Sequence, residues 1–318
     1  MKYRRLGGTD LDVSVICFGP MRAAAKKPTE DEKSKAGELA LRRALDAGVN
    51  FIHSSYEYDT RWMLAKVLKG HPLRRQIHHV IKVPVPDFKD GDRFDADKFR
   101  LHIDQALREL HAERISVLQW MWRSDPNSDQ RRLPLLGQII DDVLETYENM
   151  RDQGKVGYLM TFPYTVPCGR AAMKTGKFAG LIAYYNLIEM EMADLFEELQ
   201  QRDMGFLCIR PFYEGILTDQ RADQKSLAQG DRFAGKDYED SFLKRRKVAQ
   251  AFADQIGDSM TSFAIRFALA APFLSSVIVG LNTSEQVDSI VAAVEQEFPD
   301  PQIIEKAQSL WRSDFQTK

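Results

Sequence analysis

A tyrosine and a lysine with the potential for proton-transfer chemistry lie at or near the ends of two short apolar segments. Tyr58 follows "NFIHSS" at residues 50–55, and Lys82 lies within "HHVIKVPV" at residues 78–85. Lys82 is flanked by β-branched residues, so an inward side chain would be desolvated, which disfavours the ammonium unless a partner compensates. A phenol beside such an amine is able to give or take a proton. In the alternative interpretation, the Lys82 side chain reaches the rim of the fold or a helix layer.

These residues belong to a regular alternation of short apolar segments with longer amphipathic ones. Eight segments are predicted to be strands, and an alternation of strands with helices favours parallel pairing through crossover helices. The count of eight, and the absence of G-x-G-x-x-G after the first of them, favour a closed (β/α)8 TIM barrel over an open doubly wound sheet. Reactive residues of such barrels lie at the carboxyl ends of the strands. The predicted strands are 15–19, 50–55, 78–85, 115–122, 156–162, 181–186, 205–212 and 275–281.

Segments outside this alternation have distinct predicted roles. Residues 1–14 read as an N-terminal β-hairpin, because two alternating runs flank a Gly-Gly-Thr-Asp turn. The irregular segment 212–240 follows the seventh strand and is too long to be a simple connection, so we expect it to be functional. No linker or change of composition divides the chain, and we expect one domain over residues 1–318.

The composition is ordinary for a soluble globular protein. Hydrophobic residues make up 44 % and charged residues 28 %, and the net charge of −2 gives no electrostatic footprint for nucleic acid or a membrane surface. No apolar run approaches the ~20 residues of a membrane span. Cys17, Cys168 and Cys208 are too widely spaced for a metal or redox motif. We therefore expect a cytoplasmic protein without a metal site, while the oligomeric state stays open.

Six segments occur along the chain in this order: "MKYRRLGGTDLDVSVICFGPM", "ALDAGVNFIHSSYEY", "VIKVPV", "GKVGYLMTF", "YYN" and "VIVGLNTSEQV". Together they resemble the landmarks of the aldo-keto reductase family. The resemblance extends from the hairpin to residue 287 and implies a (β/α)8 barrel that binds NADP(H) without a Rossmann motif. It implies that a hydride passes between the nicotinamide and a carbonyl while a tyrosine gives or takes the proton. By position this tyrosine is Tyr58, and Lys82 is the lysine that supports it.

Two other positions of the catalytic tetrad depart from the pattern that this resemblance implies. The family's aspartate is replaced by His53, and its carbonyl-holding histidine by Met121 in "LQWMWRSD". A neutral imidazole offers Lys82 a hydrogen bond without a negative charge, and an imidazolium would repel it. We therefore expect a degraded tetrad in which Lys82 is less firmly protonated. The catalytic candidates are Tyr58, Lys82 and His53.

The predicted substrate pocket lies at the end of the fourth strand. Strand alternation sends Trp122 to the face opposite Met121, so that either orientation makes the mouth apolar and aromatic. Met121, Trp122 and Tyr56 are the pocket candidates, and they favour a carbonyl compound or an aromatic molecule. The tail, residues 299–318, resembles the family segment that closes over the substrate. A helix packed on the outside of the barrel is an equal alternative for this tail.

The cofactor positions also depart from the family pattern. The family's Ser-Asn pair that holds the nicotinamide amide is Phe162-Pro163, and its glutamine is Ile182. Gly280 is retained, and a helix is predicted to start after it. The N-terminus of a helix suits a phosphate. Asn282, however, replaces a basic residue of the family pattern. Lost recognition of an amide leaves ligand donors and acceptors unpaired. The candidate cofactor-binding residues are Phe162, Asn186, Arg210, Gly280, Asn282, Ser284 and Gln286.

Three functions follow from these observations. The first is a diverged NADP(H)-dependent carbonyl reductase or alcohol dehydrogenase with Tyr58 as the general acid and base. The second is a lyase or isomerase in which Lys82, without its carboxylate, forms a Schiff base. The third is a binding protein that keeps the barrel and has lost catalysis. The family resemblance favours the first, and the replaced tetrad residues favour the other two.

Overall fold

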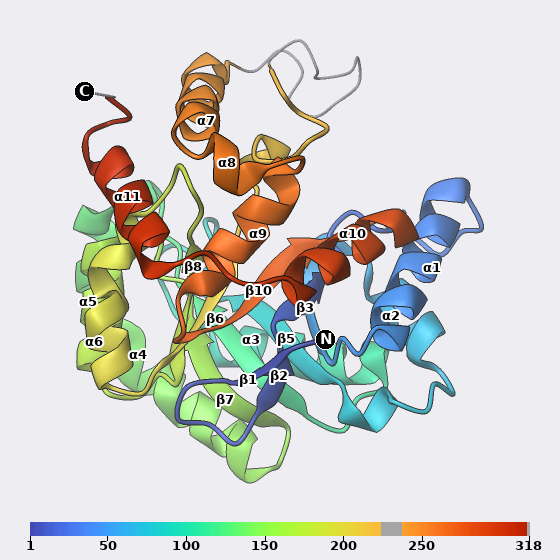
Figure 1. Cartoon of the computed structure of the whole chain (residues 1–318). Helices are drawn as coiled ribbons and strands as arrows, with labels where there is room; N and C mark the ends of the chain where they lie inside the picture. The colour runs from blue at the N-terminus through green and yellow to red at the C-terminus, as the bar shows by residue number, and fades with distance from the viewer. Residues whose placement is uncertain (224–236, 317–318) are drawn as a thin grey trace.

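The computed structural model describes residues 1–223 and 237–316, whose strands form a closed parallel barrel (Figure 1). Around the barrel the order is β10-β3-β4-β5-β6-β7-β8-β9, and each strand is parallel to its neighbours. The predicted (β/α)8 architecture is therefore confirmed. The barrel strands are β3 Ile16–Gly19, β4 Phe51–Ser55, β5 His78–Pro84, β6 Ile115–Met121, β7 Val156–Thr161, β8 Gly180–Tyr184, β9 Gly205–Ile209 and β10 Leu274–Gly280.

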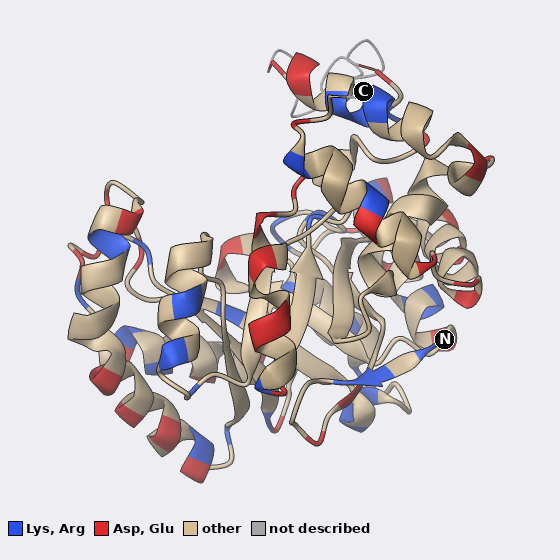
Figure 2. Cartoon of the chain, turned by 60° about the vertical axis from the view of Figure 1, so that its left-hand side comes forward, with Lys and Arg blue, Asp and Glu red and all other residues tan. Residues whose placement is uncertain are grey.

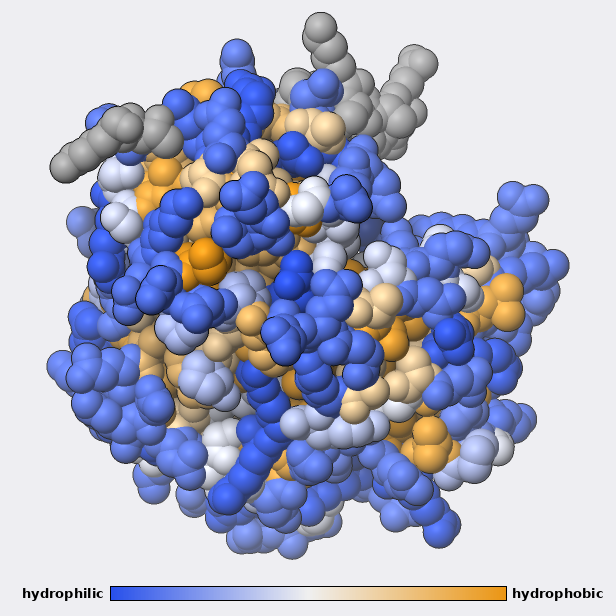
Figure 3. All heavy atoms as spheres, viewed as in Figure 1, coloured by the Kyte–Doolittle hydropathy of each residue, from blue (hydrophilic) through white to orange (hydrophobic). Residues whose placement is uncertain are grey.

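Helices form the layer outside the barrel. Charged residues of both signs are spread along them while the barrel strands carry few (Figure 2), and the face in Figure 3 is mostly hydrophilic with scattered apolar spots. No helix of the described residues is long and apolar enough to cross a membrane. The α-helices are α1 Glu32–Asp46, α2 Arg61–Leu68, α3 Ala96–Leu110, α4 Asp129–Asp152, α5 Val166–Lys174, α6 Phe196–Gln201, α7 Glu239–Ala251, α8 Ala253–Ile256, α9 Met260–Ala270, α10 Ser284–Glu295 and α11 Pro301–Arg312.

Helix α3 illustrates why these segments are helical and how they pack. Its start is capped by the Asp95 carboxylate, which accepts a hydrogen bond from the Lys98 backbone N–H at 2.9 Å. Its end is marked by His111, whose left-handed backbone has φ of 50°. Between these caps the apolar residues recur at helical spacing and are buried toward the barrel. They are Phe99, Ile103, Ala106 and Leu110.

The amino-terminal end of the barrel is closed by apolar side chains. The predicted hairpin is confirmed as the antiparallel pair β1 Tyr3–Arg5 and β2 Asp12–Ser14, and its buried Leu6 and Val13 pack against the lowest interior layer. Each barrel strand contributes one residue to this layer, so the interior opens only toward the carboxyl ends. The layer consists of Cys17, Phe51, Val80, Val117, Met160, Ile182, Leu207 and Ile278.

The next interior layer is mostly polar. Because inward residues of a strand recur at every second position, it contains the residues two places further along each strand. Gly19 and Gly280 are register partners in the neighbouring strands β3 and β10, so this part of the barrel wall carries no side chains. The layer consists of Gly19, His53, Lys82, Gln119, Phe162, Tyr184, Ile209 and Gly280.

His53 and Gln119 form a hydrogen bond with each other within this layer. The His53 Nε2 and Gln119 Oε1 atoms are 2.8 Å apart, and both side chains are buried. Burial lowers the pKa of His53 to about 4, while the hydrogen bond to Gln119 opposes this and the Lys82 charge adds to it. His53 is therefore a neutral imidazole near pH 7.

Trp120 and Trp122 lie on the outward face of β6 and its extension. Their rings stack at 5.1 Å, and the indole N–H groups donate to the Val85 and Arg132 carbonyls at 2.7 and 2.9 Å. Trp122 is completely buried within the apolar cluster between barrel and helices. Its predicted place in the substrate pocket is wrong, because strand alternation turns Met121 inward and Trp122 outward.

The C-terminal tail packs on the outer helices. Helix α11 lies against α9, the Lys306 ammonium donates to the Ala251 carbonyl at 2.6 Å, and Phe315 is buried. The tail therefore contains a helix packed on the outside of the barrel, which was the second of the two predicted alternatives. Of the predicted functional segment 212–240, residues 224–236 lie outside the described part of the chain.

We expect Trp122→Ala to destabilise the fold by about 3–5 kcal/mol, because it removes a buried indole and leaves a cavity. Equilibrium unfolding in urea measures this change in the free energy of unfolding. The control is Leu101→Ala on α3, where the side chain is 55 % exposed and the expected change is within about 0.5 kcal/mol. A loss below about 1 kcal/mol for Trp122→Ala would contradict the packing described.

We expect His53 to make the protein less stable in acid. Its pKa is about 4 in the folded state and 6.5 in the reference state, so between these values the unfolded chain binds more protons and stability falls as the pH falls. The loss is complete below pH 4 and on the order of 3 kcal/mol. Urea unfolding of the wild type and of His53→Gln at several pH values measures it. The wild type should lose more stability than the variant; equal losses would contradict a neutral, buried His53.

Candidate active site

The candidate active site begins in the turn that follows β4. The 3-10 helix η1, Tyr56–Tyr58, starts at Ser55, whose hydroxyl accepts the Glu57 backbone N–H at 3.3 Å. It ends at Asp59, which has a left-handed backbone with φ of 54°. This tight turn holds the half-buried Tyr58 at the carboxyl end of the barrel, where the prediction placed reactive residues.

Tyr58, Lys82 and His53 lie together in the structure. The Lys82 Nζ atom is 4.7 Å from the centroid of the Tyr58 ring, and the His53 ring centroid is 5.8 Å from that of Tyr58. Lys82 points into the barrel, as its position between β-branched neighbours suggested. The amine and the phenol are therefore placed within reach of one small molecule.

Glu57 provides the carboxylate that the sequence analysis considered missing. Its Oε2 atom lies 2.5 Å from Lys82 Nζ. The expectation that Lys82 lacks a carboxylate partner is therefore wrong, and the imidazole of His53 bonds to Gln119 instead. A carboxylate directly before Tyr58 was the available sequence signal. Position 53 does not reveal it, because the counter-ion of Lys82 comes from the turn after β4 and not from the strand.

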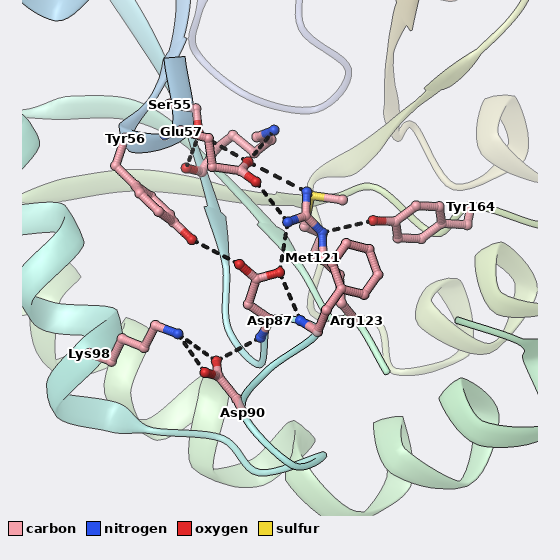
Figure 4. A network of polar contacts seen from close by, with 11 residues as sticks. Ser55, Tyr56, Glu57, Asp87, Asp90, Lys98, Met121, Arg123 and Tyr164 are labelled. Carbon is pink, nitrogen blue, oxygen red and sulfur yellow. Dashed lines mark hydrogen bonds and ion pairs between the residues drawn. The ribbon is translucent and has the colours of Figure 1, made fainter. Parts of the chain in front are cut away.

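Arg123 links Glu57 to a second carboxylate (Figure 4). Its Nη1 atom lies 2.8 Å from Glu57 Oε1 and 2.8 Å from Asp87 Oδ1, and its Nε–H donates to the Tyr164 hydroxyl at 3.0 Å. The Tyr56 hydroxyl donates to the other oxygen of Asp87 at 3.2 Å. These residues come from the segments after four successive strands, β4 to β7, and only the closed barrel brings them together.

Burial and charge act on these groups in opposite directions. Burial lowers the pKa of Lys82, and the Glu57 charge opposes that shift. Burial alone would raise the pKa of Glu57, but Arg123 and Lys82 outweigh it and the pKa is lowered. Burial and the Glu57 charge raise the pKa of Tyr58. Near pH 7 Glu57 is therefore ionised, and Tyr58 is a protonated phenol.

The mouth of the barrel is more polar than predicted. The expectation of an apolar, aromatic mouth is wrong, because ion pairs line one side of it and Trp122 faces away. Met121 faces inward, with its sulfur 4.0 Å from Arg123 Nη2. The Phe162 ring lies edge-on to the rings of Tyr164 and Tyr184, with centroid distances of 4.6 and 5.1 Å, so this predicted cofactor residue packs among the aromatic residues of the mouth.

Tyr56 belongs to the wall around the site. Its ring stacks on His102 of α3 at 3.9 Å, and its hydroxyl holds Asp87. The structure therefore assigns Tyr56 to the support of the ion-pair network. Among the described residues, the contacts of Tyr56 are with Asp87 and His102 and give no support to its predicted role in the substrate pocket.

A cavity of about 560 Å³ opens at the carboxyl ends of β3, β9 and β10. Its walls are the end of β3, the segment after β9 and the turn from β10 into α10. Gly19 and Gly280, which leave the barrel wall without side chains, both line it, so the cavity adjoins the polar interior layer. The predicted cofactor-binding residues that line this cavity are Arg210, Gly280, Asn282 and Gln286.

The two sides of this cavity differ in their polar groups. On one side Arg210 pairs with Glu189 and with Glu214, each at 3.4 Å. Arg210 lies between the Tyr184 and Tyr213 rings, 4.7 and 4.5 Å from their centroids. On the other side the Asn282 Oδ1 atom is buried and has no hydrogen-bond partner among the described residues. The Gln286 side chain accepts the Asn282 backbone N–H at 2.8 Å and so fixes this turn.

The structure places three of the predicted cofactor residues, Phe162, Asn186 and Ser284, outside the cavity lining. Asn186 is buried, and its amide donates to Glu189 Oε2 and to the Arg210 carbonyl, both at 3.0 Å, so it supports the backbone of Arg210. Ser284 is the first residue of α10 and does not contribute to the lining. Among the residues that the structure describes, no group of His, Cys, Asp and Glu is arranged to hold a metal ion.

Comparisons with known proteins agree with this geometry. The chain is 24 % identical to L-galactose dehydrogenase of Arabidopsis thaliana, over 93 % of this chain and 89 % of the relative. It is 27 % identical to the uncharacterized oxidoreductase YrpG of Bacillus subtilis strain 168, over 93 % of this chain and 91 % of the relative. The holo form of aldo-keto reductase AKR11C1 from Bacillus halodurans has the same fold, with a TM-score of 0.74 at 19 % identity, covering 98 % of this chain and 96 % of that chain. The sequence model of the aldo/keto reductase family matches residues 15–310, and the chain belongs to that family.

Proposed function

We propose that the protein is an NADP(H)-dependent oxidoreductase that interconverts a carbonyl and an alcohol, with Tyr58 as the proton donor and acceptor. Membership of the aldo/keto reductase family and the dehydrogenase and oxidoreductase names of its relatives support an oxidoreductase. The observation that carries the proposal is the Lys82 ammonium 4.7 Å from the Tyr58 ring centroid, at the open end of the barrel. An amine and a phenol so placed suit proton transfer to a substrate oxygen.

The residues of the 560 Å³ cavity fit a dinucleotide. Its lining includes the cations Arg22, Arg210 and Arg221, which suit phosphates, and the carboxylates of Glu214 and Asp219, which balance part of that charge. The unpartnered Asn282 Oδ1 suits the amino group of a base or carboxamide. Glu285 in the first turn of α10 also lines the cavity and repels a phosphate there, contrary to the expectation for this helix start. We therefore assign the phosphates to the arginine side. When bound, the cofactor supplies or accepts the hydride.

The protein side chains account for the proton. In the reduction, the Tyr58 hydroxyl donates its proton to the substrate oxygen; in the oxidation, the phenolate takes a proton back. Burial raises the pKa of Tyr58 and keeps it protonated before reduction. The nearby Lys82 cation stabilises the phenolate that remains after the proton has left.

The ion pair with Glu57 weakens the Schiff-base alternative. That alternative needed a Lys82 without a carboxylate, whereas Glu57 Oε2 is 2.5 Å from its amine. A carboxylate at this distance favours the ammonium, which is not a nucleophile. The binding-protein alternative differs from our proposal in the expected effect of replacing Tyr58, as described below.

We propose an uncharged, polar carbonyl compound as the substrate. Beside Tyr58, Lys82 and Arg123 are already paired with Glu57 and Asp87 at 2.5–2.8 Å, so a charged group on the substrate gains no free partner there. The name of the Arabidopsis relative, L-galactose dehydrogenase, is consistent with a hydroxylated substrate of this kind. The three cysteines are free and buried, which supports the proposed cytoplasmic location.

We expect Tyr58→Phe to lower kcat by about 10²- to 10⁴-fold, because the proton donor is lost while the ring remains. Oxidation of NADPH with a panel of neutral aldehydes and ketones measures turnover. The control is Tyr158→Phe. In the wild type the Tyr158 hydroxyl donates to Asp10 Oδ1 at 2.8 Å, at the opposite end of the barrel, so this variant should keep the wild-type kcat. Full turnover in Tyr58→Phe would exclude Tyr58 as the proton donor. A wild type that neither binds nor oxidises NADPH would exclude the proposed function and favour a binding protein.

We expect Asn282→Leu to affect cofactor affinity and ligand-free stability in opposite directions. Loss of the acceptor should weaken NADPH binding by about 5- to 150-fold, whereas removal of a buried oxygen without a partner should leave the free protein as stable or more stable. Fluorescence titration measures the Kd, and thermal unfolding without ligand measures the stability. Ser284→Ala, outside the cavity lining, is the control. An unchanged Kd for Asn282→Leu would contradict the assignment of the cavity.

A further inference from the structure

We propose that Glu57 and Arg123 are positioning residues of this active site, and that the Glu57 carboxylate is shared between the Lys82 amine and the Arg123 guanidinium. In this arrangement the carboxylate that holds Lys82 comes from the turn that carries Tyr58 and is itself held by Arg123. Residue 53 in the strand wall is then free to be a neutral histidine. The inference rests on the proposed function, because it concerns how Lys82 is kept beside Tyr58.

Glu57 makes a separate contact with each cation. Its Oε2 atom is 2.5 Å from Lys82 Nζ, and its Oε1 atom is 2.8 Å from Arg123 Nη1. The Ser55 hydroxyl accepts the Glu57 backbone N–H and lies 3.4 Å from Oε2. The Glu57 side chain is only 27 % exposed. A carboxylate held at both oxygens and at its backbone has little freedom to leave Lys82.

Arg123 is itself held in place on several sides. Its side chain is 9 % exposed, its Nη1 atom also contacts Asp87 Oδ1, and its Nε–H bonds to Tyr164. Asp87 in turn accepts the Phe88 backbone N–H at 2.8 Å and the Tyr56 hydroxyl. Because Asp87 balances part of its charge, Arg123 is able to share Glu57 with Lys82 without competing for the whole carboxylate. The fixed planar guanidinium suits this role.

Consecutive residues of one turn contact the same amine. Glu57 pairs with Lys82 Nζ, and the ring of Tyr58 lies 4.7 Å from that atom. Both residues belong to the short helix η1, which the Ser55 side chain caps. The distance between the acid–base residue and the lysine is therefore set by the same turn that supplies the lysine's counter-ion.

The groups that face Lys82 show why it needs Glu57. They are Glu57 and Tyr58 from η1, His53 from β4, Arg123 from the turn after β6 and Tyr184 from β8. His53 is neutral and occupied by Gln119, and Arg123 is a like charge. Burial and Arg123 both lower the pKa of Lys82, and Glu57 is the carboxylate that opposes them.

The test uses variants whose pH dependence should shift in opposite directions. Glu57→Gln removes the shared charge, so Lys82 should lose its proton at a pH lower by about 1–3 units. The kcat for reduction should fall at least about tenfold, and its alkaline limb should move to lower pH, with little change in KM. Arg123→Gln removes the like charge but leaves Glu57 beside Lys82 in the turn that Ser55 caps. Its kcat should fall because Glu57 is less firmly held, while its alkaline limb should move to higher pH. General damage to the fold would not move the alkaline limbs of the two variants in opposite directions.

A rescue variant tests whether the charge itself is what matters. Glu57→Gln combined with His53→Asp restores a carboxylate on the inward face of β4, where Gln119 is able to donate to it. We expect this double variant to recover both kcat and the position of the alkaline limb toward the wild-type values. Glu109→Gln is the matched control, because Glu109 pairs with the buried Arg61 at 2.8 Å outside the barrel, and it should leave the profile unchanged.

A second readout does not require turnover. Reductive methylation of the full-length protein over a range of pH, with peptide mass spectrometry, gives the pH at which Lys82 becomes reactive. This pH should be lower in Glu57→Gln than in the wild type. If Lys82 reactivity is the same in both, the inference is wrong, whatever the kinetics. If the reactivity shifts as expected but no carbonyl compound is reduced, the shared carboxylate is supported and the proposed function fails.

Discussion

The structure of this site depends on one electrostatic constraint, the cost of keeping a lysine cation inside a barrel. Burial destabilises the Lys82 ammonium, and the neighbouring Arg123 adds to the cost. Glu57 offsets both through an ion pair at 2.5 Å. This pair lies at the open end of the interior, because the opposite end is filled by apolar side chains and the hairpin. Lys82, Glu57 and Tyr58 are therefore brought together where a small molecule is able to enter.

The same constraint extends outward through paired charges. Arg123 contacts Glu57 and Asp87, and Asp87 is held by Tyr56, so each charge in the chain of contacts has an opposite neighbour. The mouth is consequently polar but charge-balanced. On the other side of the barrel, the facing glycines of β3 and β10 remove side chains between the interior and the cavity. The site thus has one charged wall, where we propose the proton transfer, and one open side, where we propose the dinucleotide.

Much of this arrangement was predictable because it follows from local patterns. Strand and helix periods, together with the count of eight strands, predicted the barrel, and apolar flanks predicted an inward Lys82. Other residues were misjudged because their roles depend on orientation. Trp122 lies one residue from Met121 but faces the helices, and Asn186 uses its amide to hold the Arg210 backbone. A position in a motif does not specify which groups a side chain will meet.

The sequence by itself determined the order of strands and helices, the family, and the presence of a phenol and an amine at the ends of neighbouring strands. These properties depend on residue types and spacings along the chain. The tertiary structure alone decided that Glu57, and not residue 53, neutralises Lys82, and that Arg123 and Asp87 complete the network. The reason is that charge interactions depend on distance in space, and closing the barrel brings residues 57, 82, 87 and 123 within a few ångströms of one another.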